Sequence, residues 1–216
     1  MRRPLAAGIA AVAVIASTAS AAPEQVTLLV RPAVVVGDQS TTVAGTVESR
    51  RADEIVTIQA NDCGPVTQGF RDVAEARTEE GGSWSIPFYP RINTVLRAVW
   101  KGDTSVQVPV RQRAWVYLIP RSVASGKLHV GVSAKVSFWR KRVLIQRFDR
   151  RLGRWTTIRS VVLTETGFAN PQTGAVSAWA EFKSSTIRKG SLLRAVFPLS
   201  QARPCYFAGV SKILQR

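Results

Sequence analysis

The residues best suited to chemistry in this sequence are the cations of one short stretch, FWRKRVLIQRFDRRLGRW, which runs from Phe138 to Trp155. Seven Lys and Arg side chains and four aromatic rings stand there against a single acid, Asp149. The planar guanidinium group of arginine matches the oxygens of phosphate and carboxylate groups. The stretch therefore predicts an anion-binding surface; the alternative is a solvated β-hairpin whose charge has no partner. The candidate binding residues are Arg140, Lys141, Arg142, Arg147, Arg150, Arg151 and Arg154.

Groups suited to catalysis are scarce. The single histidine, His129, alternates with apolar residues in KLHVGVSAKV, which predicts a side chain on the outer face of a strand. A Ser-His-Asp site needs a histidine that converges with a serine and an acid, and no nucleophile-elbow sequence occurs. The paired acids at 53–54 and 79–80 fall in predicted turns, and no spacing matches a metal site or a phosphate loop. We therefore expect neither an enzyme nor a bound cofactor or metal.

Tryptophan is a second candidate for ligand binding, because an indole ring offers a flat apolar face and a polar N–H group. The six tryptophans lie at predicted strand positions, where aromatic residues usually fill a sandwich core or cover a sheet face. Carbohydrate stacking is therefore the less favoured interpretation. The tryptophans are Trp84, Trp100, Trp115, Trp139, Trp155 and Trp179.

The net charge of +16 is distributed unevenly. Residues 23–113 contain ten Lys and Arg against eleven Asp and Glu, a balance of −1. Residues 114–216 contain eighteen against three, a balance of +15, and two arginines before residue 23 supply the remaining +2. A GC-rich genome explains the excess of arginine over lysine, but it does not explain the shortage of acids in the second half. The shift predicts two units with different surfaces.

The first residues have the pattern of an export signal. Arg2 and Arg3 precede an apolar run from Leu5 to Ala16, and Ala19-Ser20-Ala21 supplies a small-residue cleavage site. The run is shorter than the about 20 residues that a membrane-spanning helix needs. We predict a signal peptide over residues 1–21 and a mature chain without a transmembrane segment. The mature protein is expected to be secreted or held to the envelope by non-covalent contacts.

Short alternating segments rich in Val, Thr, Ile and aromatic residues recur along the rest of the chain, and none keeps a helical period over three turns. They recur at the spacing of a seven-stranded sandwich. The predicted strands of the first half are Val26–Arg31, Thr41–Val47, Glu54–Ala60, Phe70–Arg77, Trp84–Phe88, Thr94–Trp100 and Ser105–Arg111.

The second half repeats this plan. Val56–Gln59 corresponds to Val143–Gln146 with an offset of 87 residues, and Leu96–Trp100 corresponds to Leu193–Phe197 with an offset of 97. The difference predicts an insertion in the second copy around Gly167–Pro171. The predicted fold is all-β, with two consecutive seven-stranded immunoglobulin-like sandwiches over residues 22–113 and 114–216. No Pro/Ser/Gly-rich linker separates them, so we expect a rigid junction.

Several segments bring a family into view: VTIQANDCG, GGSWS and NTVLRAVWKG in the first half, then VLIQRFDRRLGRWTTI and SLLRAVFPLSQARPCYFAGVS in the second. They resemble tandem immunoglobulin-like modules of secreted proteins from GC-rich Gram-positive bacteria. The resemblance covers nearly all of the mature chain and implies a sandwich fold and export. Its motifs are strand-packing patterns, so it assigns no catalytic residue.

The two cysteines lie in different halves. Cys63 follows the third predicted strand of the first copy, and Cys205 lies between the sixth and seventh strands of the second. In stacked sandwiches these positions belong to the poles that face each other. An exported chain also favours oxidation. We predict a disulfide that locks the angle between the halves; two buried free thiols and intermolecular pairing are the alternatives.

On the predicted fold the candidate cations fall into two groups. Arg140–Arg142 lie at the pole nearest the first half and Arg150–Arg154 at the free tip, about 20–25 Å away at about 3.3 Å per residue. Asp149 is expected to bond its own backbone in the turn. Because a unit of charge +15 has too few acids for internal pairing, an anionic partner would relieve its self-repulsion.

The predicted function is a non-catalytic secreted or cell-surface binding module whose second domain docks electrostatically on an acidic wall polymer or polysaccharide. Because the protein is expected to be exported, intracellular nucleic acid is excluded as a partner. The alternative is a structural or protein-interaction rod with incidental charge, which would contact another envelope protein through an exposed strand edge. A monomer is expected in either case.

Overall fold

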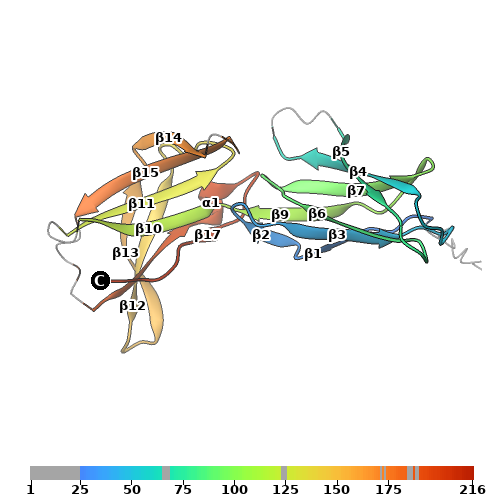
Figure 1. Ribbon diagram of the computed structural model, residues 1–216. Helices are drawn as coiled ribbons and strands as arrows, with labels where there is room; N and C mark the ends of the chain where they lie inside the picture. The colour runs from blue at the N-terminus through green and yellow to red at the C-terminus, as the bar shows by residue number, and fades with distance from the viewer. Residues whose placement is uncertain are drawn as a thin grey trace, which may run out of the picture.

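The computed structural model describes residues 25–64, 69–122, 126–170, 172, 174–183, 187 and 190–216. The predicted signal peptide over residues 1–21 and Pro171 of the predicted insertion lie outside these residues. The described chain is nearly all β, with its sheets in a sandwich-like arrangement, which confirms the predicted class. Figure 1 shows an elongated molecule with residues 25–113 at one end and residues 114–216 at the other. Within the described residues no helix is long and apolar enough to cross a membrane.

Residues 25–113 form two sheets that enclose one core. The first sheet has the order β1 (Leu29–Arg31), β3 (Thr41–Thr46), β6 (Ser83–Phe88). The second has the order β2 (Val34–Val36), β9 (Val108–Arg113), β7 (Thr94–Trp100), β4 (Ile55–Asp62), β5 (Arg71–Arg77), and β8 (Asp103–Thr104) pairs with β7. β2 pairs with β9 in parallel, and the other neighbours are antiparallel.

Residues 114–216 form two further sheets around a second core. One has the order β10 (Trp115–Ser122), β11 (Lys127–Ala134), β15 (Ala175–Lys183), β14 (Glu165–Asn170). The other has the order β13 (Arg154–Val162), β12 (Arg142–Asp149), β16 (Leu192–Phe197), β17 (Gly209–Val210), and β18 (Leu214–Gln215) pairs with β16. The short helix α1 (Leu199–Ala202) follows β16.

Alternation along the central strands builds both cores, because successive side chains of a strand point to opposite faces. In β7, Leu96 and Ala98 are buried between less buried neighbours, and in β16 Leu193 and Ala195 follow the same pattern. The first core draws on residues 26–110 and the second on residues 114–206. Ile92, from the loop before β7, is a first-half residue that packs in the second core. The two cores therefore meet at the junction.

The predicted strands of the first half overlap β1, β3, β4, β5, β6, β7 and β9. The sequence predicted seven strands in each half. In the described chain each half has nine, because short segments such as β2 and β8 also pair. The predicted insertion coincides with β14, which lies between β13 and β15. In the first half β5 leads to β6 without a described strand between them. The additional strand thus widens one sheet of the second half.

The predicted offsets hold for individual backbone pairs. β4 and β7 pair Ile58 with Ala98, whereas β12 and β16 pair Ile145 with Ala195, at offsets of 87 and 97 residues. A register shift follows Ile58 where β4 pairs with β5, and another follows Ile145 where β12 pairs with β13. The two halves therefore share both the register and the irregularity of their central strands.

The same correspondence extends to side chains. Arg97 Nε donates to Gln59 Oε1 at 2.7 Å, and Arg194 Nε donates to Gln146 Oε1 at 2.8 Å. Both bonds join neighbouring strands of one sheet, β7 to β4 and β16 to β12. The sequence landmarks thus mark one hydrogen-bonded unit that is present twice.

Candidate functional site

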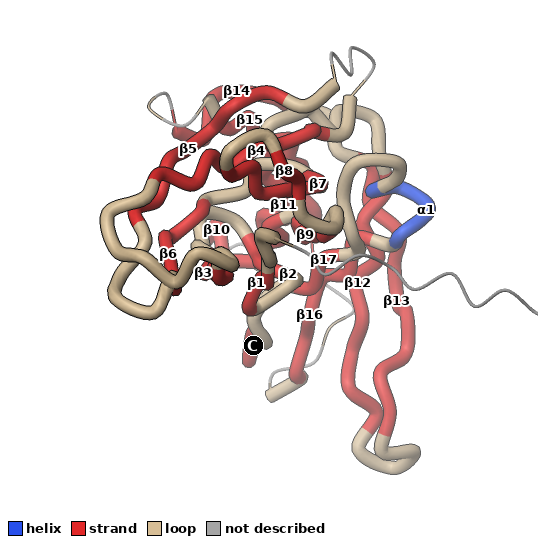
Figure 2. The backbone as a smooth tube through the Cα atoms, turned by 90° about the vertical axis from the view of Figure 1, so that its right-hand side faces the viewer, coloured by secondary structure: helices blue, strands red, loops and turns tan. Residues whose placement is uncertain are grey.

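The basic stretch forms the hairpin of β12 and β13, and its tip projects away from the rest of the molecule (Figures 1 and 2). The last backbone pair joins Asp149 to Arg154. In the turn, Asp149 Oδ1 accepts the N–H groups of Arg151 at 2.9 Å and Leu152 at 3.1 Å. Gly153 has φ +62°, a conformation that favours glycine. The predicted backbone-bonding role of Asp149 is confirmed.

Aromatic and cationic side chains stiffen the hairpin near its tip. The rings of Phe148 and Trp155 lie 5.4 Å apart, and the Arg194 guanidinium lies 4.4 Å from the Trp155 ring centroid. Arg194 was missed as a site residue because it lies about 40 positions further along the sequence. The signal that identifies it is the pairing of Gln146 with Arg194 across β12 and β16. Phe138 is buried, and Trp155 is half-buried.

The structure separates the seven candidate cations by position along β12. Arg150, Arg151 and Arg154 are exposed at the tip, and Arg147 is half-buried on the strand below them. The remaining three, Arg140, Lys141 and Arg142, are exposed at the opposite end of β12.

The second group lies close to the junction between the halves. The backbone N–H group of Arg142 donates to Gln201 Oε1 of α1 at 3.1 Å. Arg140 has φ +63°, and its guanidinium lies 4.1 Å from the Trp139 ring centroid. The two groups therefore form separate cationic surfaces at the two ends of β12.

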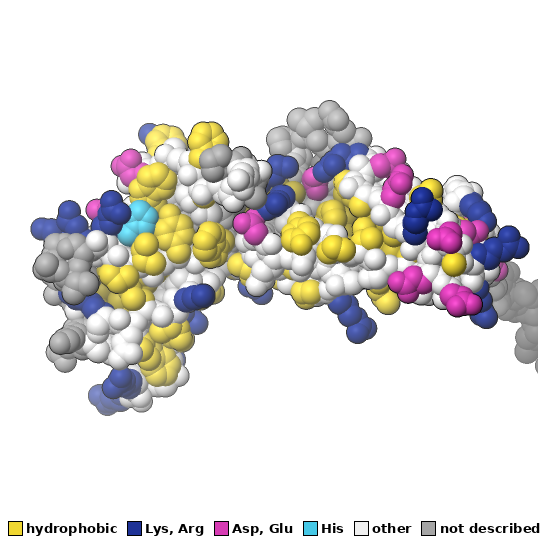
Figure 3. Space-filling model, viewed as in Figure 1, with side chains coloured by type: hydrophobic (Ala, Val, Ile, Leu, Met, Phe, Trp, Pro, Cys, Tyr) yellow, Lys and Arg dark blue, Asp and Glu magenta, His cyan; other side chains and the backbone are white. Residues whose placement is uncertain are grey.

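None of the seven candidate cations has an ion-pair partner in the described chain. Asp149, the acid nearest to them in sequence, directs Oδ1 at backbone N–H groups. In the first half, by contrast, Arg71, Arg91 and Lys101 each pair with a carboxylate. Figure 3 shows this contrast, with most of the visible acids over the first half and dark blue side chains at the hairpin tip. The hairpin therefore presents cations that are free to bind anions.

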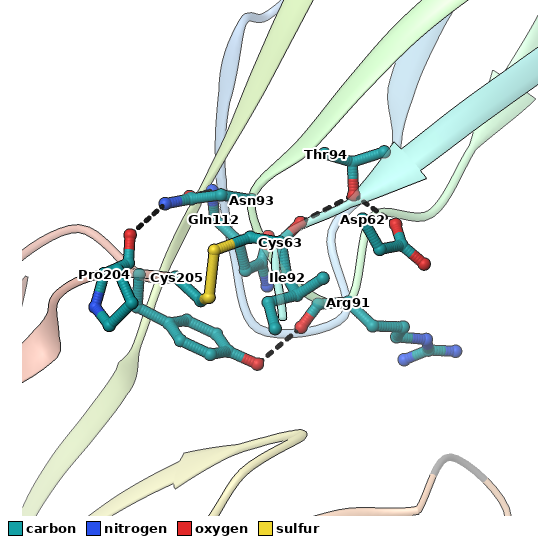
Figure 4. Close-up of a disulfide and its surroundings, with 10 residues drawn as sticks. Asp62, Cys63, Arg91, Ile92, Asn93, Thr94, Gln112, Pro204 and Cys205 are labelled. Carbon is teal, nitrogen blue, oxygen red and sulfur yellow. Dashed lines mark hydrogen bonds between the residues drawn. A yellow bond between two sulfur atoms is a disulfide. The ribbon is translucent and has the colours of Figure 1, made fainter. Parts of the chain in front are cut away.

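The junction between the halves contains the predicted disulfide. Cys63 lies just after β4 and Cys205 lies after α1, and their Cα atoms are 5.3 Å apart (Figure 4). The bond joins residues 142 positions apart in one chain, so the alternatives of free thiols and intermolecular pairing are wrong.

Asn93 connects three segments around this bond. Its N–H group donates to Cys205 O at 3.0 Å, and its carbonyl accepts the N–H group of Cys63 at 2.8 Å. Its Oδ1 accepts the N–H group of Gln112 at 2.8 Å, and its Nδ2 donates to Pro204 O at 3.4 Å (Figure 4). Asn93 thus helps to hold the halves together through both its backbone and its side-chain amide.

Tyr206 closes the other side of the junction and is 2% exposed. Its hydroxyl donates to Arg91 O at 2.6 Å and accepts the N–H group of Lys135 at 2.9 Å. Its ring packs against Phe138, with centroids 5.5 Å apart. Burial raises the pKa of Tyr206 to about 12, because the phenolate would lose its hydration.

His129 lies on the outer face of β11, as predicted. Its ring stacks on Tyr117 and Trp179, with centroids 5.5 Å and 6.2 Å away. Its Nδ1 lies 3.9 Å from Glu181 Oε1, too far for a hydrogen bond, and burial lowers the pKa of His129. Among the residues with described positions, no group of three His, Cys, Asp or Glu side chains could hold a metal ion.

The tryptophans divide between core and surface. Trp84 and Trp100 are buried in the first core, and Trp155 and Trp179 are half-buried. Trp115 and Trp139 are 53% and 46% exposed. Comparison with known proteins adds no identity: no protein-family description matches this sequence, and no curated protein matches it as a relative.

Proposed function

We propose that this protein is a non-catalytic binding module, secreted or retained at the cell surface, which docks electrostatically on an acidic envelope polymer. In this proposal it consists of two immunoglobulin-like sandwiches, over residues 22–113 and 114–216, and the second carries the docking surface. Residues 1–21 act as a signal peptide. The resemblance to tandem modules of secreted Gram-positive proteins supports this arrangement.

The strand order supports the immunoglobulin-like assignment. In each half the first strand pairs with the next long one, β1 with β3 and β10 with β11, and these pair in turn with β6 and β15. The facing sheet places β4 between β5 and β7, and β12 between β13 and β16. A sandwich with this kind of chain order is typical of immunoglobulin-like and related folds. The inter-half disulfide fits an oxidising compartment and so supports export.

The observation that carries the docking function is the unpaired charge of the hairpin tip. Arg150, Arg151 and Arg154 are exposed, have no ion-pair partner in the described chain, and lie on a turn whose shape Asp149 maintains. Arginines held in this way offer donors to carboxylate or phosphate oxygens without first breaking an internal pair. An acidic wall polymer or polysaccharide is the partner class that an exported protein of this charge would meet.

Retention on phosphocellulose and on purified acidic wall polymer tests this function. Wild-type protein should bind at low salt and elute steeply between about 50 mM and about 500 mM salt, because exposed charges are screened. The variant Arg150→Ser/Arg151→Ser/Arg154→Ser should elute much earlier. The variant Arg50→Ser/Arg51→Ser/Arg77→Ser removes three exposed first-half cations and should elute close to wild type. Equal elution of the two triple variants would contradict a docking role for the hairpin.

A second candidate is a structural rod that spaces or joins other envelope proteins. The observation in its favour is the junction, where a disulfide and the bonds of Asn93 and Tyr206 tie the halves together. If the protein is a structural rod, its retention on the acidic polymer should not depend on the charges of the hairpin. A pull-down from envelope extracts, with and without the hairpin substitutions, distinguishes the two.

A further inference from the structure

Trp115 stands between two hollows on the surface at the junction of the halves. It is the first residue of β10 and directly follows Ala114, where the chain passes from one half to the other. Trp115 lines both a cavity of about 300 Å³ and a groove of about 710 Å³ along β10. Volumes of this size lie within or near the range that small ligands occupy in proteins.

Both halves contribute polar groups to the smaller cavity. Asp38, Arg91 and Gln112 come from the first half, and Lys135 comes from the second. Asp38 and Arg91 form an ion pair, with side chains that remain partly open to solvent. The cavity exists only because the junction fixes the halves against each other, and Tyr206 forms part of its wall.

Gln112 gives the wall of this cavity an unused acceptor. The residue is 3% exposed, and its Nε2 donates to Gly37 O at 2.6 Å, which settles the orientation of the amide. Its Oε1 has no hydrogen-bond partner among the atoms of the described chain. Leaving such an acceptor unpaired costs about 1–3 kcal/mol, which a hydrogen-bond donor within reach would offset.

A row of rings continues from Trp115 over the outer face of the sheet. The centroids of Trp115 and Tyr117 are 6.2 Å apart, and the row proceeds through His129 to Trp179. Gly131 allows this arrangement, since a Cβ atom there would lie 2.2 Å from the Tyr117 hydroxyl oxygen. Figure 3 shows hydrophobic side chains gathered over this face beside the histidine. Because the rings contact one another, binding would cost little side-chain freedom.

We infer that the cavity beside Trp115 and the row of rings together form a glycan-binding site. A sugar unit has an apolar C–H face, which suits the Trp115 ring, and hydroxyl groups that both donate and accept, which suit Asp38, Arg91, Gln112 and Lys135. Further units of the chain lie over Tyr117 and Trp179. A purely apolar ligand would offer these polar groups no hydrogen bond, whereas sugar hydroxyl groups do. The site is separate from the cationic hairpin tip and needs no charge on the ligand.

Isothermal titration calorimetry with oligosaccharides derived from dextran, mannan, galactan, xylan and chitin tests this inference. About 300 mM salt in the buffer suppresses binding through the hairpin. At least one oligosaccharide should bind wild type, and the variant Trp115→Ala should lose at least about tenfold in affinity, as expected for a central aromatic contact. Trp115→Phe should retain part of the affinity but lose the change in tryptophan fluorescence that accompanies binding.

Two controls separate this site from other causes of binding. Trp139 is a comparably exposed tryptophan, 46% against 53% for Trp115, and Trp139→Ala should bind as wild type. The Arg150→Ser/Arg151→Ser/Arg154→Ser variant should also bind as wild type, because the hairpin takes no part. Lack of binding of all five oligosaccharides, or equal binding by wild type and a folded Trp115→Ala variant, overturns the inference.

Discussion

The two halves of this protein have matching interiors and contrasting surfaces. The bond between Gln59 and Arg97 in the first half recurs between Gln146 and Arg194 in the second, at nearly the same length. The formal net charges of the halves differ, at −1 over residues 23–113 and +15 over residues 114–216. Central strands must satisfy the same pairing and packing in both halves, whereas exposed positions are free to change. The function is therefore to be sought where the halves differ.

The ends of β4 and β12 illustrate this contrast. With the offset of 87 residues that relates β4 to β12, Asp62 corresponds to Asp149 and Cys63 to Arg150. The end of β4 faces the junction, so Cys63 forms the disulfide. The end of β12 leads to the free tip, so Arg150 is exposed to solvent. The position directly after the strand thus holds the molecule together in one half and is available for binding in the other.

Removing the disulfide should have the largest effect on stability, because this bond is the covalent cross-link between the two halves. The bond spans 142 residues, so the variant Cys63→Ser/Cys205→Ser should lose about 4–5 kcal/mol of unfolding free energy on the chain-entropy model. Guanidinium unfolding measures the loss, and small-angle scattering should show a wider range of angles between the halves. Far-ultraviolet circular dichroism serves as the control that both halves remain folded. Unchanged scattering would mean that Asn93 and Tyr206 suffice to hold the junction.

A smaller and matched effect is expected from two buried serines. Ser105 Oγ accepts the Ala98 N–H group at 2.9 Å, and Ser211 Oγ accepts the Ala195 N–H group at 2.9 Å. Ser105→Ala and Ser211→Ala should each cost about 1–3 kcal/mol, because each leaves a buried N–H group without that partner. Chemical denaturation measures both, with the exposed Ser85→Ala as a control near zero. A large effect in one half alone would weaken the equivalence of the halves.

The smallest expected effect concerns pH and belongs to the second half. Burial, with a contribution from Arg121, lowers the pKa of His129 below its ordinary 6.5, while Glu181 acts in the opposite direction. The unfolded chain therefore binds this proton at a higher pH than the folded chain does. The contribution of neutral His129 to stability is complete above about pH 6.5 and falls as the pH decreases toward the folded pKa.

Urea unfolding of wild type and His129→Gln between about pH 8 and about pH 5 measures this contribution. The stability of wild type relative to the variant should decrease as the solution becomes more acidic. A difference that stays constant over the whole range would show that His129 has the same affinity for protons in the folded and unfolded states.

Much of the fold was predictable because its signals are local. Alternating segments predicted the strands that became β3 to β7, and the offset landmarks predicted the register of the central pairs. The turn-shaping role of Asp149 also follows from neighbouring residues. The parallel pairing of β2 with β9 was not anticipated, because it joins residues more than 70 positions apart and β2 is only three residues long.

The candidate sites were predictable to different degrees for the same reason. The cations of the hairpin are close together in sequence, so their division between the two ends of β12 was evident. The rings of Tyr117, His129 and Trp179 come from three strands, and only the sheet brings them together. Arg194 likewise reaches Trp155 through the pairing of β12 with β16.

The sequence by itself determined the all-β class, the repeat and the uneven charge, since strand alternation and composition depend on residues close together in the chain. Tertiary structure alone decided which carboxylates pair with cations, how Asn93 and Tyr206 close the junction, and that a cavity forms beside Trp115. The bond between Tyr206 and Arg91 joins residues 115 positions apart, and such features arise only when both cores are packed and the halves meet.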